Sequence, residues 1–235
     1  MKVKYKMIAD KLSQDIMTGK YQEMDKLPTE EVLIEEYQVS RTTIRNALNV
    51  LIQNGFVLPI QGSGFFVRPI RHQGYINLEV YKGLSEGTPY KKLETFLLDF
   101  QLIKADEKLA KEMKCEIETE IYYLQRLRSI DDEKRIIEYS YFNKDLIPYL
   151  NEDIARHSIY HFIQHDLKLE IGFVDRIIEA RTLTDNEAKY LELPKGSPAL
   201  VTTNYAMLKN GRIFDYSIDV YHYQKSKFLK LSNFN

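Results

Sequence analysis

Two short amphipathic segments follow one another near the start of the chain, separated by only a few residues. They cover about residues 30–37 and 41–53, and in both the apolar side chains recur every three or four positions. This spacing predicts two helices that each bury one side. Because the connection is so short, the two helices must meet across a tight turn, as in a helix-turn-helix. An earlier stripe predicts one more helix before them, built on Tyr5, Ile8, Leu12 and Ile16.

Residues that cap helices stand where these helices should begin. Thr29 precedes the first of the pair, and Glu30 and Glu31 occupy its first turn, where the helix dipole favours acidic side chains. Ser40 precedes the second helix, and Gly55 ends it. The local sequence therefore agrees with the periodicity on where the helices lie.

The outward side of the helix at 41–53 carries hydrogen-bond donors and amides but no carboxylate of its own. These residues are Arg41, Thr42, Arg45, Asn46 and Asn49. Arginine can bind guanine edges or phosphates through its forked guanidinium, and asparagine can bind adenine. A solvated polar surface would explain the same strip, so the strip alone leaves both interpretations open.

Residues 56–67, FVLPIQGSGFFV, combine two β-branched and aromatic runs around a glycine-rich turn at 61–64. This pattern predicts a small hairpin. A helix-turn-helix followed by a hairpin is a winged helix, in which one helix enters the major groove and the hairpin tip reaches the DNA alongside. The turn has neither the Lys-Ser/Thr of a P-loop nor the G-x-S-x-G of a hydrolase.

The stretch from Leu27 to Val67 resembles the winged helix of the GntR family of bacterial transcription regulators. The family pattern runs LPSE, VSR-T-R-AL-L and G-G-FV, and this chain has LPTE at 27–30, VSRTTIR at 39–45 and GSGFFV at 62–67. Glu31 stands where some members carry an arginine that contacts DNA. With the chemistry of the strip, the resemblance implies binding to double-stranded operator DNA by Thr29, Glu30, Ser40, Arg41, Thr42, Thr43, Arg45, Asn46, Gln61 and Gly62.

The remainder of the chain alternates between strand-like and helix-like segments. Residues 68–78 mix proline, glycine and basic residues without a period, which indicates a linker. Domains are expected at 1–70 and 78–235, with the linker at 71–77. Tight turns such as Asn210-Gly211 predict an antiparallel sheet with helices packed on it, hence an α+β domain in a mixed α/β chain. The expected strands are 93–103, 120–130, 135–143, 172–182, 199–208 and 212–222, and the expected helices are 106–114, 152–167 and one opening at 184.

Polar residues mark two strands of this second domain. Arg126 and Arg128 must share one face of their strand and can clamp an anion together. They would repel each other without an acidic partner, and Glu138 is a candidate, so a structural ion pair and a ligand site both remain open. In the last long strand, polar residues alternate with apolar ones, which fits a solvated face as well as a binding face: Asp215, Ser217, Asp219 and Tyr221.

The order of these elements resembles UTRA, the effector-binding domain of the HutC subfamily of GntR regulators, which shares its fold with chorismate lyase. The likeness rests on the R-x-R at 126–128, the acid ten residues later, S-x-Y at 158–160, and an acid and a tyrosine six residues apart near the end. It implies that a sugar phosphate is bound through its phosphate by Arg126, Arg128 and Ser158, with Tyr160 nearby. It implies that Glu138, Asp215 and Tyr221 bind the sugar hydroxyls. The loop at 83–90 is shorter than in many relatives.

Composition limits the remaining classes. The net charge of −1 provides no general basic field, and the single cysteine, Cys115, permits no internal disulfide. No apolar run is long enough for a membrane span, and charged residues interrupt the first segment, so a cytoplasmic protein is expected. No cofactor is expected.

Three alternatives compete with a sugar-phosphate effector. His157, His161 and His165 follow one another at helical spacing and could bind a metal. The many aromatic residues leave a fatty acid or another carboxylate open, and the chorismate lyase-like fold leaves an enzyme open, although no catalytic constellation is present. The favoured hypothesis is a homodimeric repressor of sugar uptake or catabolism genes, which a phosphorylated sugar releases from a near-palindromic operator.

Overall fold

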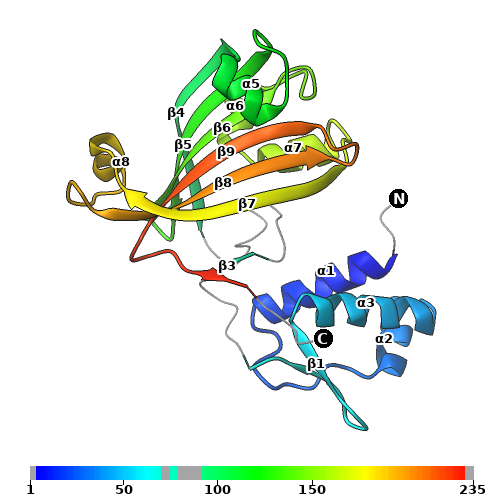
Figure 1. Cartoon of the computed structure of the whole chain (residues 1–235). Helices are drawn as coiled ribbons and strands as arrows, with labels where there is room; N and C mark the ends of the chain where they lie inside the picture. Colours follow the sequence, from blue (N-terminus) through cyan, green and yellow to red (C-terminus); the bar gives the residue numbers. More distant parts are fainter. Residues whose placement is uncertain (1–3, 70–74, 79–91, 231–235) are drawn as a thin grey trace. The chain divides into compact units, whose positions relative to one another are not determined.

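The computed structural model describes residues 4–69, 75–78 and 92–230 (Figure 1). Its contacts divide the chain into two compact units, residues 1–81 with 227–235 and residues 82–226. The loop at 83–90 and most of the linker at 71–77 lie outside the described residues. No helix in the described ranges is both long enough and apolar enough to cross a bilayer.

The first unit contains the predicted winged helix. Its helices are α1 (Lys4–Met17), α2 (Glu30–Tyr37) and α3 (Arg41–Gln53), and its hairpin, the wing, consists of β1 (Val57–Ile60) and β2 (Gly64–Val67). The two strands pair antiparallel. Between them Gly62 has a φ of 75°, in the left-handed region that glycine adopts without strain.

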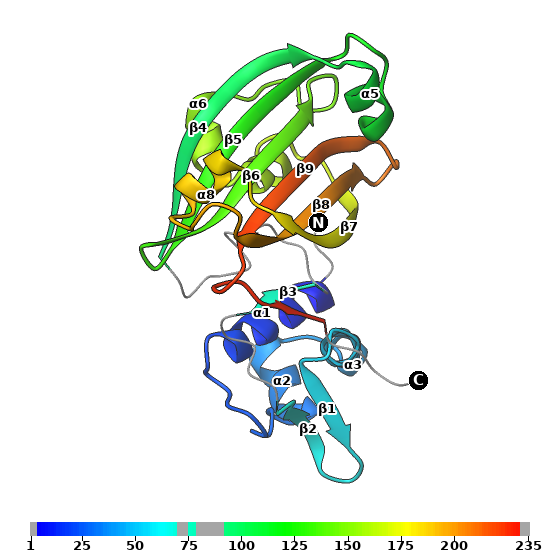
Figure 2. The ribbon, with the colours of Figure 1, turned by 60° about the vertical axis from the view of Figure 1, so that its left-hand side comes forward.

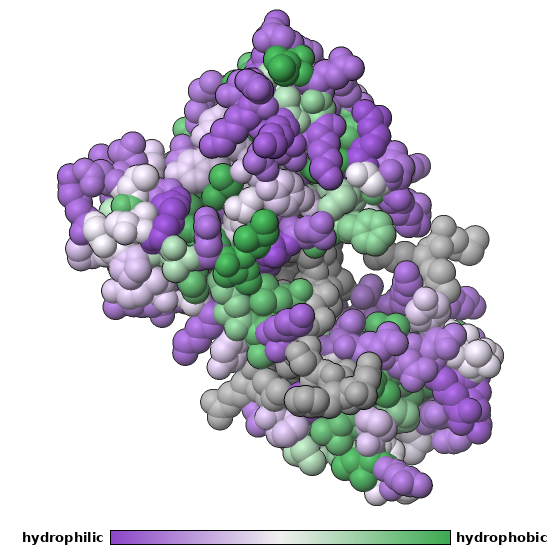
Figure 3. Space-filling view, in the orientation of Figure 1, coloured by the Kyte–Doolittle hydropathy of each residue, from purple (hydrophilic) through white to green (hydrophobic). Residues whose placement is uncertain are grey.

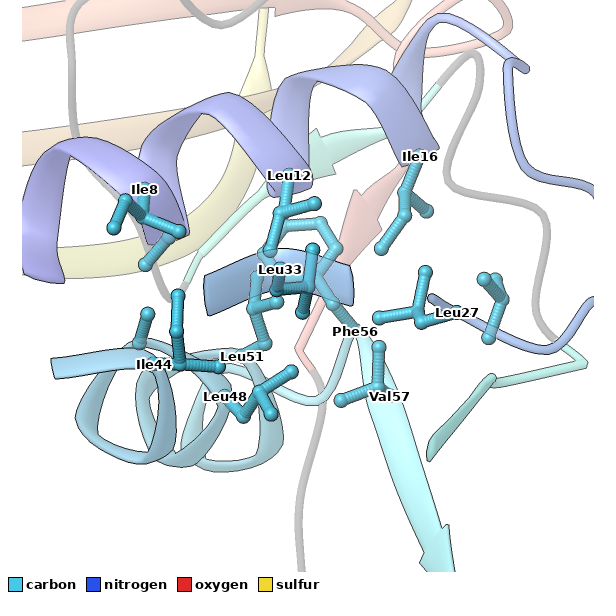
Figure 4. Packing of buried hydrophobic residues seen from close by; sticks show 13 residues of the cluster. Ile8, Leu12, Ile16, Leu27, Leu33, Ile44, Leu48, Leu51, Phe56 and Val57 are labelled. Atoms are coloured by element: carbon cyan, nitrogen blue, oxygen red, sulfur yellow. The ribbon is translucent and has the colours of Figure 1, made fainter. Parts of the chain in front are cut away.

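Capping and burial explain why these helices form here. Thr29 accepts a hydrogen bond from the backbone N–H of Val32, and Ser40 accepts one from that of Thr43, so each helix start is satisfied by its predicted cap. The apolar stripes of the three helices meet in one core (Figure 4). Its members include Ile8, Leu12, Ile16, Leu33, Ile44, Leu48 and Leu51.

A second, two-stranded sheet in this unit was not predicted. The strand β3 (Ile76–Asn77) pairs in parallel with β10 (Phe228–Leu229). Ile76 N–H donates to the carbonyl of Lys227 at 2.8 Å, and Leu78 N–H donates to that of Leu229 at 2.9 Å. The end of the linker is therefore a strand bound to a segment about 150 residues away along the chain.

The second unit is built on a six-stranded sheet in the order β4-β5-β6-β9-β8-β7. All neighbouring strands in it are antiparallel, as the sequence predicted. The strands are β4 (Leu93–Lys104), β5 (Glu120–Ile130), β6 (Glu133–Asn143), β7 (Ile171–Thr182), β8 (Pro198–Leu208) and β9 (Ile213–His222).

Helices cover both faces of this sheet. Ala110 of α5 (Glu107–Met113) packs with Ile121, whereas Ile159 of α7 (Ile159–His165) packs with Leu124, and successive odd and even positions of a strand point to opposite faces. The short α6 (Glu152–Arg156) lies on the α7 side, and α8 (Asp185–Tyr190) packs on the α5 side. In Figure 2, α5 and α8 lie toward opposite ends of the strands.

The outer face of the sheet, on the α5 and α8 side, carries an aromatic row. Tyr123, Tyr141, Tyr216 and Tyr205 lie side by side on four adjacent strands, with ring centroids 5.2, 5.7 and 5.3 Å apart. Hydrophobic side chains gather near the middle of this unit in Figure 3. Exposed apolar residues of the edge strand β7 include Phe173 and Ile177.

The single helix expected at 152–167 is wrong, because the chain breaks between α6 and α7. His157 is extended (φ −111°, ψ −160°), and Ser158 caps the start of α7 by accepting from the N–H of His161. The break leaves backbone carbonyls available to other donors. Arg126 Nη1 donates to the carbonyl of Ala155 at 3.1 Å and to that of His157 at 3.3 Å.

Candidate DNA-binding surface and effector site

The predicted DNA-binding residues of α3 are exposed on the side opposite its core. Arg41, Thr42, Arg45 and Asn46 are exposed, and Thr43 is half-buried. Gln61 and Gly62 are exposed at the tip of the wing. Thr29 and Ser40 cap helices, and Ser40 Oγ lies 2.9 Å from Thr43 Oγ1. The hydroxyls of Thr29 and Ser40 therefore have a structural role as helix caps.

Two glutamates of α2 bring carboxylates to the strip, which the sequence of α3 alone did not indicate. Arg45 Nε donates to both carboxylate oxygens of Glu30, at 3.1 and 3.0 Å. Arg41 Nη2 donates to Glu31 Oε1 at 3.0 Å. The turn places the start of α2 beside α3, so these carboxylates come from α2, while α3 has none of its own.

In the second unit, the polar side of β9 is buried, so its interpretation as a solvated face is wrong. Asp215 is 2% exposed, Ser217 3%, Asp219 8% and Tyr221 4%. Buried polar groups are costly unless they are satisfied by partners. Such a concentration on one face of a sheet indicates a binding site or an internal polar network.

The strand register places the polar residues of β9 on the same face of the sheet as Arg126 and Arg128. Arg126 on β5 lies opposite Glu138 on β6, and Glu138 lies opposite Asp219 on β9, which is itself opposite Thr202 on β8. We call the buried polar side chains of this face the buried polar cluster. It consists of Arg126, Arg128, Glu138, Ser140, Thr202, Asn204, Asp215, Ser217 and Asp219.

Glu138 lies between the two arginines of the cluster. Its Oε2 is 2.8 Å from Arg126 Nη2, and Arg128 Nη1 donates to both of its oxygens at 3.1 Å. Burial opposes ionisation of this carboxyl, but the two guanidiniums outweigh it and hold the pKa of Glu138 below its ordinary value. The ion pair that the sequence left open is therefore present.

Asp215 is linked to α7 through Tyr160, whose hydroxyl donates to Asp215 Oδ2 at 2.7 Å. Burial raises the pKa of Asp215 to about 7, against the lowering effect of this hydrogen bond. Its Oδ1 atom and the Nε atom of Arg126 are buried and have no hydrogen-bond partner among the described residues. A donor and an acceptor without partners match a ligand hydroxyl, which can accept one hydrogen bond and donate another.

A hydrogen-bond network on β8 and β9 was not among the predicted features. Asp219 Oδ2 accepts from Asn204 Nδ2 at 2.9 Å, from Thr202 Oγ1 at 3.2 Å and from Tyr221 Oη at 3.3 Å. Arg176 Nε of β7 donates to Asn204 Oδ1 at 2.7 Å. Burial, and next to it the charge of Glu138, raises the pKa of Asp219 to about 6. The alternation of polar residues at 202 and 204 was a signal that could have identified this network.

The three histidines do not share one helix. His157 lies at the break, and its Nδ1 is 2.7 Å from the carbonyl oxygen of Asp153. The rings of His161 and His165 stack with centroids 4.2 Å apart. Within the described ranges, no three His, Cys, Asp or Glu residues are arranged to hold a metal.

Comparison with known proteins agrees with both parts of this description. Residues 4–67 match the bacterial regulatory proteins of the gntR family, and residues 90–227 match the UTRA domain. The HTH-type transcriptional regulator YydK of Bacillus subtilis (strain 168) is 34% identical over 231 residues, which are 98% of each chain.

The chain belongs to the GntR family. Its UTRA domain places it in the HutC subfamily, which confirms both resemblances drawn from the sequence. The crystal structure of YydK matches with a TM-score of 0.82, covering 98% of this GntR-family chain and all of that one. The predicted winged helix and antiparallel-sheet domain are thereby confirmed.

Two further relatives are regulators as well. TreR of Bacillus subtilis (strain 168) is 31% identical over 97% of both chains. The mannosyl-D-glycerate transport/metabolism system repressor MngR of Escherichia coli (strain K12) is 28% identical over 95% of this chain and 93% of its own. This GntR-family chain is thus a transcription regulator and not an enzyme.

Proposed function

We propose that this GntR-family chain represses genes of sugar uptake or catabolism and leaves its operator when a phosphorylated sugar binds at the buried polar cluster. The observation that carries the proposal is the burial of two guanidiniums, Arg126 and Arg128, around a single glutamate. Two guanidiniums that share one carboxylate concentrate positive charge at this end of the cluster, which is the charge that a phosphate group requires. Guanidiniums bind phosphate through paired, charge-assisted hydrogen bonds.

The other end of the site suits a polyol. Asp215 and Tyr160 supply a carboxyl and a hydroxyl, and Tyr221 and Asp219 supply a second pair of the same kind. Because burial raises the pKa of both aspartates, these groups form hydrogen bonds to sugar hydroxyls with a smaller desolvation cost than fully charged acids. Ser158 follows His157, whose carbonyl accepts from Arg126, and is the candidate for an additional phosphate contact.

The relatives support the gene class. One is named a repressor of mannosyl-D-glycerate transport and metabolism. The effector-binding domain of the trehalose repressor TreR of Bacillus subtilis matches with a TM-score of 0.55 and 27% identity over 60% of this chain. Sugar-responsive regulation in proteins of the same two-domain design makes a sugar phosphate the first class to test.

On DNA, the chain acts as a homodimer in this proposal. One winged helix, which we call the head (residues 4–67), contacts few base pairs. Two heads related by a two-fold axis bind two half-sites about one helical turn apart. The linker at 71–77 transmits the effector signal to the heads. For a nearly complete switch, the effector must favour the DNA-free state by several kcal/mol.

A thermal-unfolding screen tests the effector. The full chain is heated with a panel of hexose phosphates and disaccharide phosphates, with the matching free sugars and with inorganic phosphate. We expect one sugar phosphate to raise the melting temperature, its free sugar to fail, and Arg128→Ala to abolish the shift. Arg135→Ala, on the neighbouring strand and paired with Glu133, is the matched control that keeps the shift.

Stabilisation of the chain by a fatty acid or by zinc, with no response to any sugar phosphate, would overturn the proposed effector. Release of a duplex selected by the chain from a random-sequence pool, on addition of the active sugar phosphate, tests the regulatory step. A ligand that stabilises the chain but leaves DNA binding unchanged would contradict the proposed switch.

A further inference from the structure

We infer that Glu31 is a specificity-determining residue of the DNA-binding head, which positions Arg41 for base recognition and weakens binding to DNA of arbitrary sequence. The inference rests on the proposed function, because it takes Arg41 as a residue that contacts DNA. Glu31 places a carboxylate on the surface that would face DNA, where its negative charge is repelled by the phosphates.

The two glutamate–arginine pairs of the head use different atoms. The hydrogen bonds of Arg45 to Glu30 come from Nε, the inner nitrogen of the guanidinium. The hydrogen bond of Arg41 to Glu31 comes from Nη2, one of the two terminal nitrogens. Glu31 therefore contacts one terminal nitrogen of Arg41 and leaves Nη1 outside this hydrogen bond.

The two glutamate–arginine pairs also differ in solvent exposure. The Glu30 side chain is 18% exposed, whereas Glu31 and Arg41 are 66% and 55% exposed. An exposed ion pair contributes little to folding, so the pair of Glu31 and Arg41 is not explained by stability of the head. Orienting a long, flexible side chain before binding lowers the entropy lost when it contacts a base.

The charge of Glu31 acts on the phosphates. Binding to arbitrary DNA depends on neutralising phosphates, and each neutralised phosphate adds about 0.9 to the slope of log affinity against log salt. A carboxylate beside Arg41 offsets one such charge. On DNA of arbitrary sequence this offset only weakens binding. At a guanine, hydrogen bonds from the oriented Arg41 to the base compensate for the lost electrostatic binding free energy.

The test compares two duplexes of about 30 base pairs, three helical turns of DNA. One is selected by the wild-type chain from a random-sequence pool, and the other is its scrambled counterpart. For Glu31→Ala we expect tighter binding to the scrambled duplex, with a salt slope steeper by about one unit. We expect the ratio of the two affinities to fall about tenfold, within the range of one base-specific contact.

Two further variants separate the effects of charge and position. Glu31→Gln removes the charge but keeps an oxygen that can accept from Arg41, so it should retain more of the affinity ratio than Glu31→Ala. Glu35→Ala removes an exposed acid one turn further along α2, outside the two arginine pairs of the head, and should leave the ratio unchanged. Circular dichroism melts check that the head stays folded.

Arg41→Ala distinguishes failure of the inference from failure of the proposed function. In that background Glu31→Ala should leave the affinity ratio unchanged, because no side chain remains to be positioned. If Arg41→Ala weakens binding to the selected duplex but Glu31→Ala leaves the ratio intact, the inference is overturned and the DNA-binding role of Arg41 stands. If Arg41→Ala changes neither affinity, both fail.

Discussion

Arg126 and Glu138 lie directly opposite each other on adjacent strands, and Arg126 Nη2 is 2.8 Å from Glu138 Oε2. Both side chains are buried, and Arg128 bonds to the same carboxylate. Glu138 is therefore the carboxylate that the two buried guanidiniums share, and it offsets part of the cost of burying them.

Replacing Glu138 by glutamine should destabilise the second unit. The variant keeps the shape of the side chain but removes the carboxylate charge that both buried guanidiniums contact, at a cost of about 3–5 kcal/mol in the free energy of unfolding. Urea unfolding measures this loss. Inorganic phosphate should stabilise the variant more than the wild type, and an equal response would contradict an anion site at the arginines. Glu133→Gln, in a pair that is only half-buried, should cost clearly less than Glu138→Gln.

Arg45→Ala should separate DNA binding from effector binding. Loss of its guanidinium should weaken binding to the selected duplex by about 1–3 kcal/mol, since Arg45 lies on the exposed side of α3. Fluorescence anisotropy measures this change, and the thermal shift with the active sugar phosphate should stay the same. Arg212→Ala, an exposed arginine of the second unit, is the control. Equal DNA affinities of the two variants would remove Arg45 from the DNA-binding surface.

Asp215 should make stability depend on pH. Its pKa is about 7 in the folded chain against an ordinary value of 3.8, so between these values the folded state binds the extra proton. The contribution of this group to the free energy of unfolding therefore falls as the pH rises from about 4 to about 7. Asp215→Asn removes that dependence.

Urea unfolding at about pH 5 and at about pH 8 measures this effect. The stability of Asp215→Asn relative to the wild type should improve by up to about 3 kcal/mol at the higher pH, following the value of each pKa unit. Asp145→Asn, at an exposed position, should show no such change. A relative stability of Asp215→Asn that is the same at both values would show that Asp215 is ionised throughout.

Leu33→Ala should lower the folding stability of the head and leave the second unit folded. Leu33 is fully buried in the core of the three helices, and truncating such a leucine costs about 2–5 kcal/mol. We expect lost or weakened DNA binding with an unchanged effector response, measured by anisotropy and by thermal shift. Val32→Ala, at an exposed neighbour, should change neither. Loss of the effector response in Leu33→Ala would show that the two units do not fold independently.

Local spacing was sufficient for the head. The caps at Thr29 and Ser40 act within three residues of their own position, and the apolar stripes need only the helical period to define a core face. Local spacing does not predict the contact between Glu31 and Arg41, because the two residues come from different helices and meet only when the turn sets the crossing of these helices.

In the second unit, strand alternation placed Asp215, Asp219 and Tyr221 on one face but left open whether water covered that face. The register with β6 and β8 buried it and brought Asp219 against residues 17 and 15 positions earlier, Thr202 and Asn204. The break at His157 also depended on a distant partner, since its carbonyl and that of Ala155 accept from Arg126, about 30 residues earlier.

The sequence by itself determined most of the helices and strands, where most of those begin, and which side chains share a face, because these properties follow from the backbone period and from neighbours a few residues away. The tertiary structure decided which polar face is buried, which acid meets which arginine, and that the linker strand pairs with the C-terminal segment. Those outcomes depend on residues that are far apart along the chain, and no local pattern encodes the partner that folding brings to them.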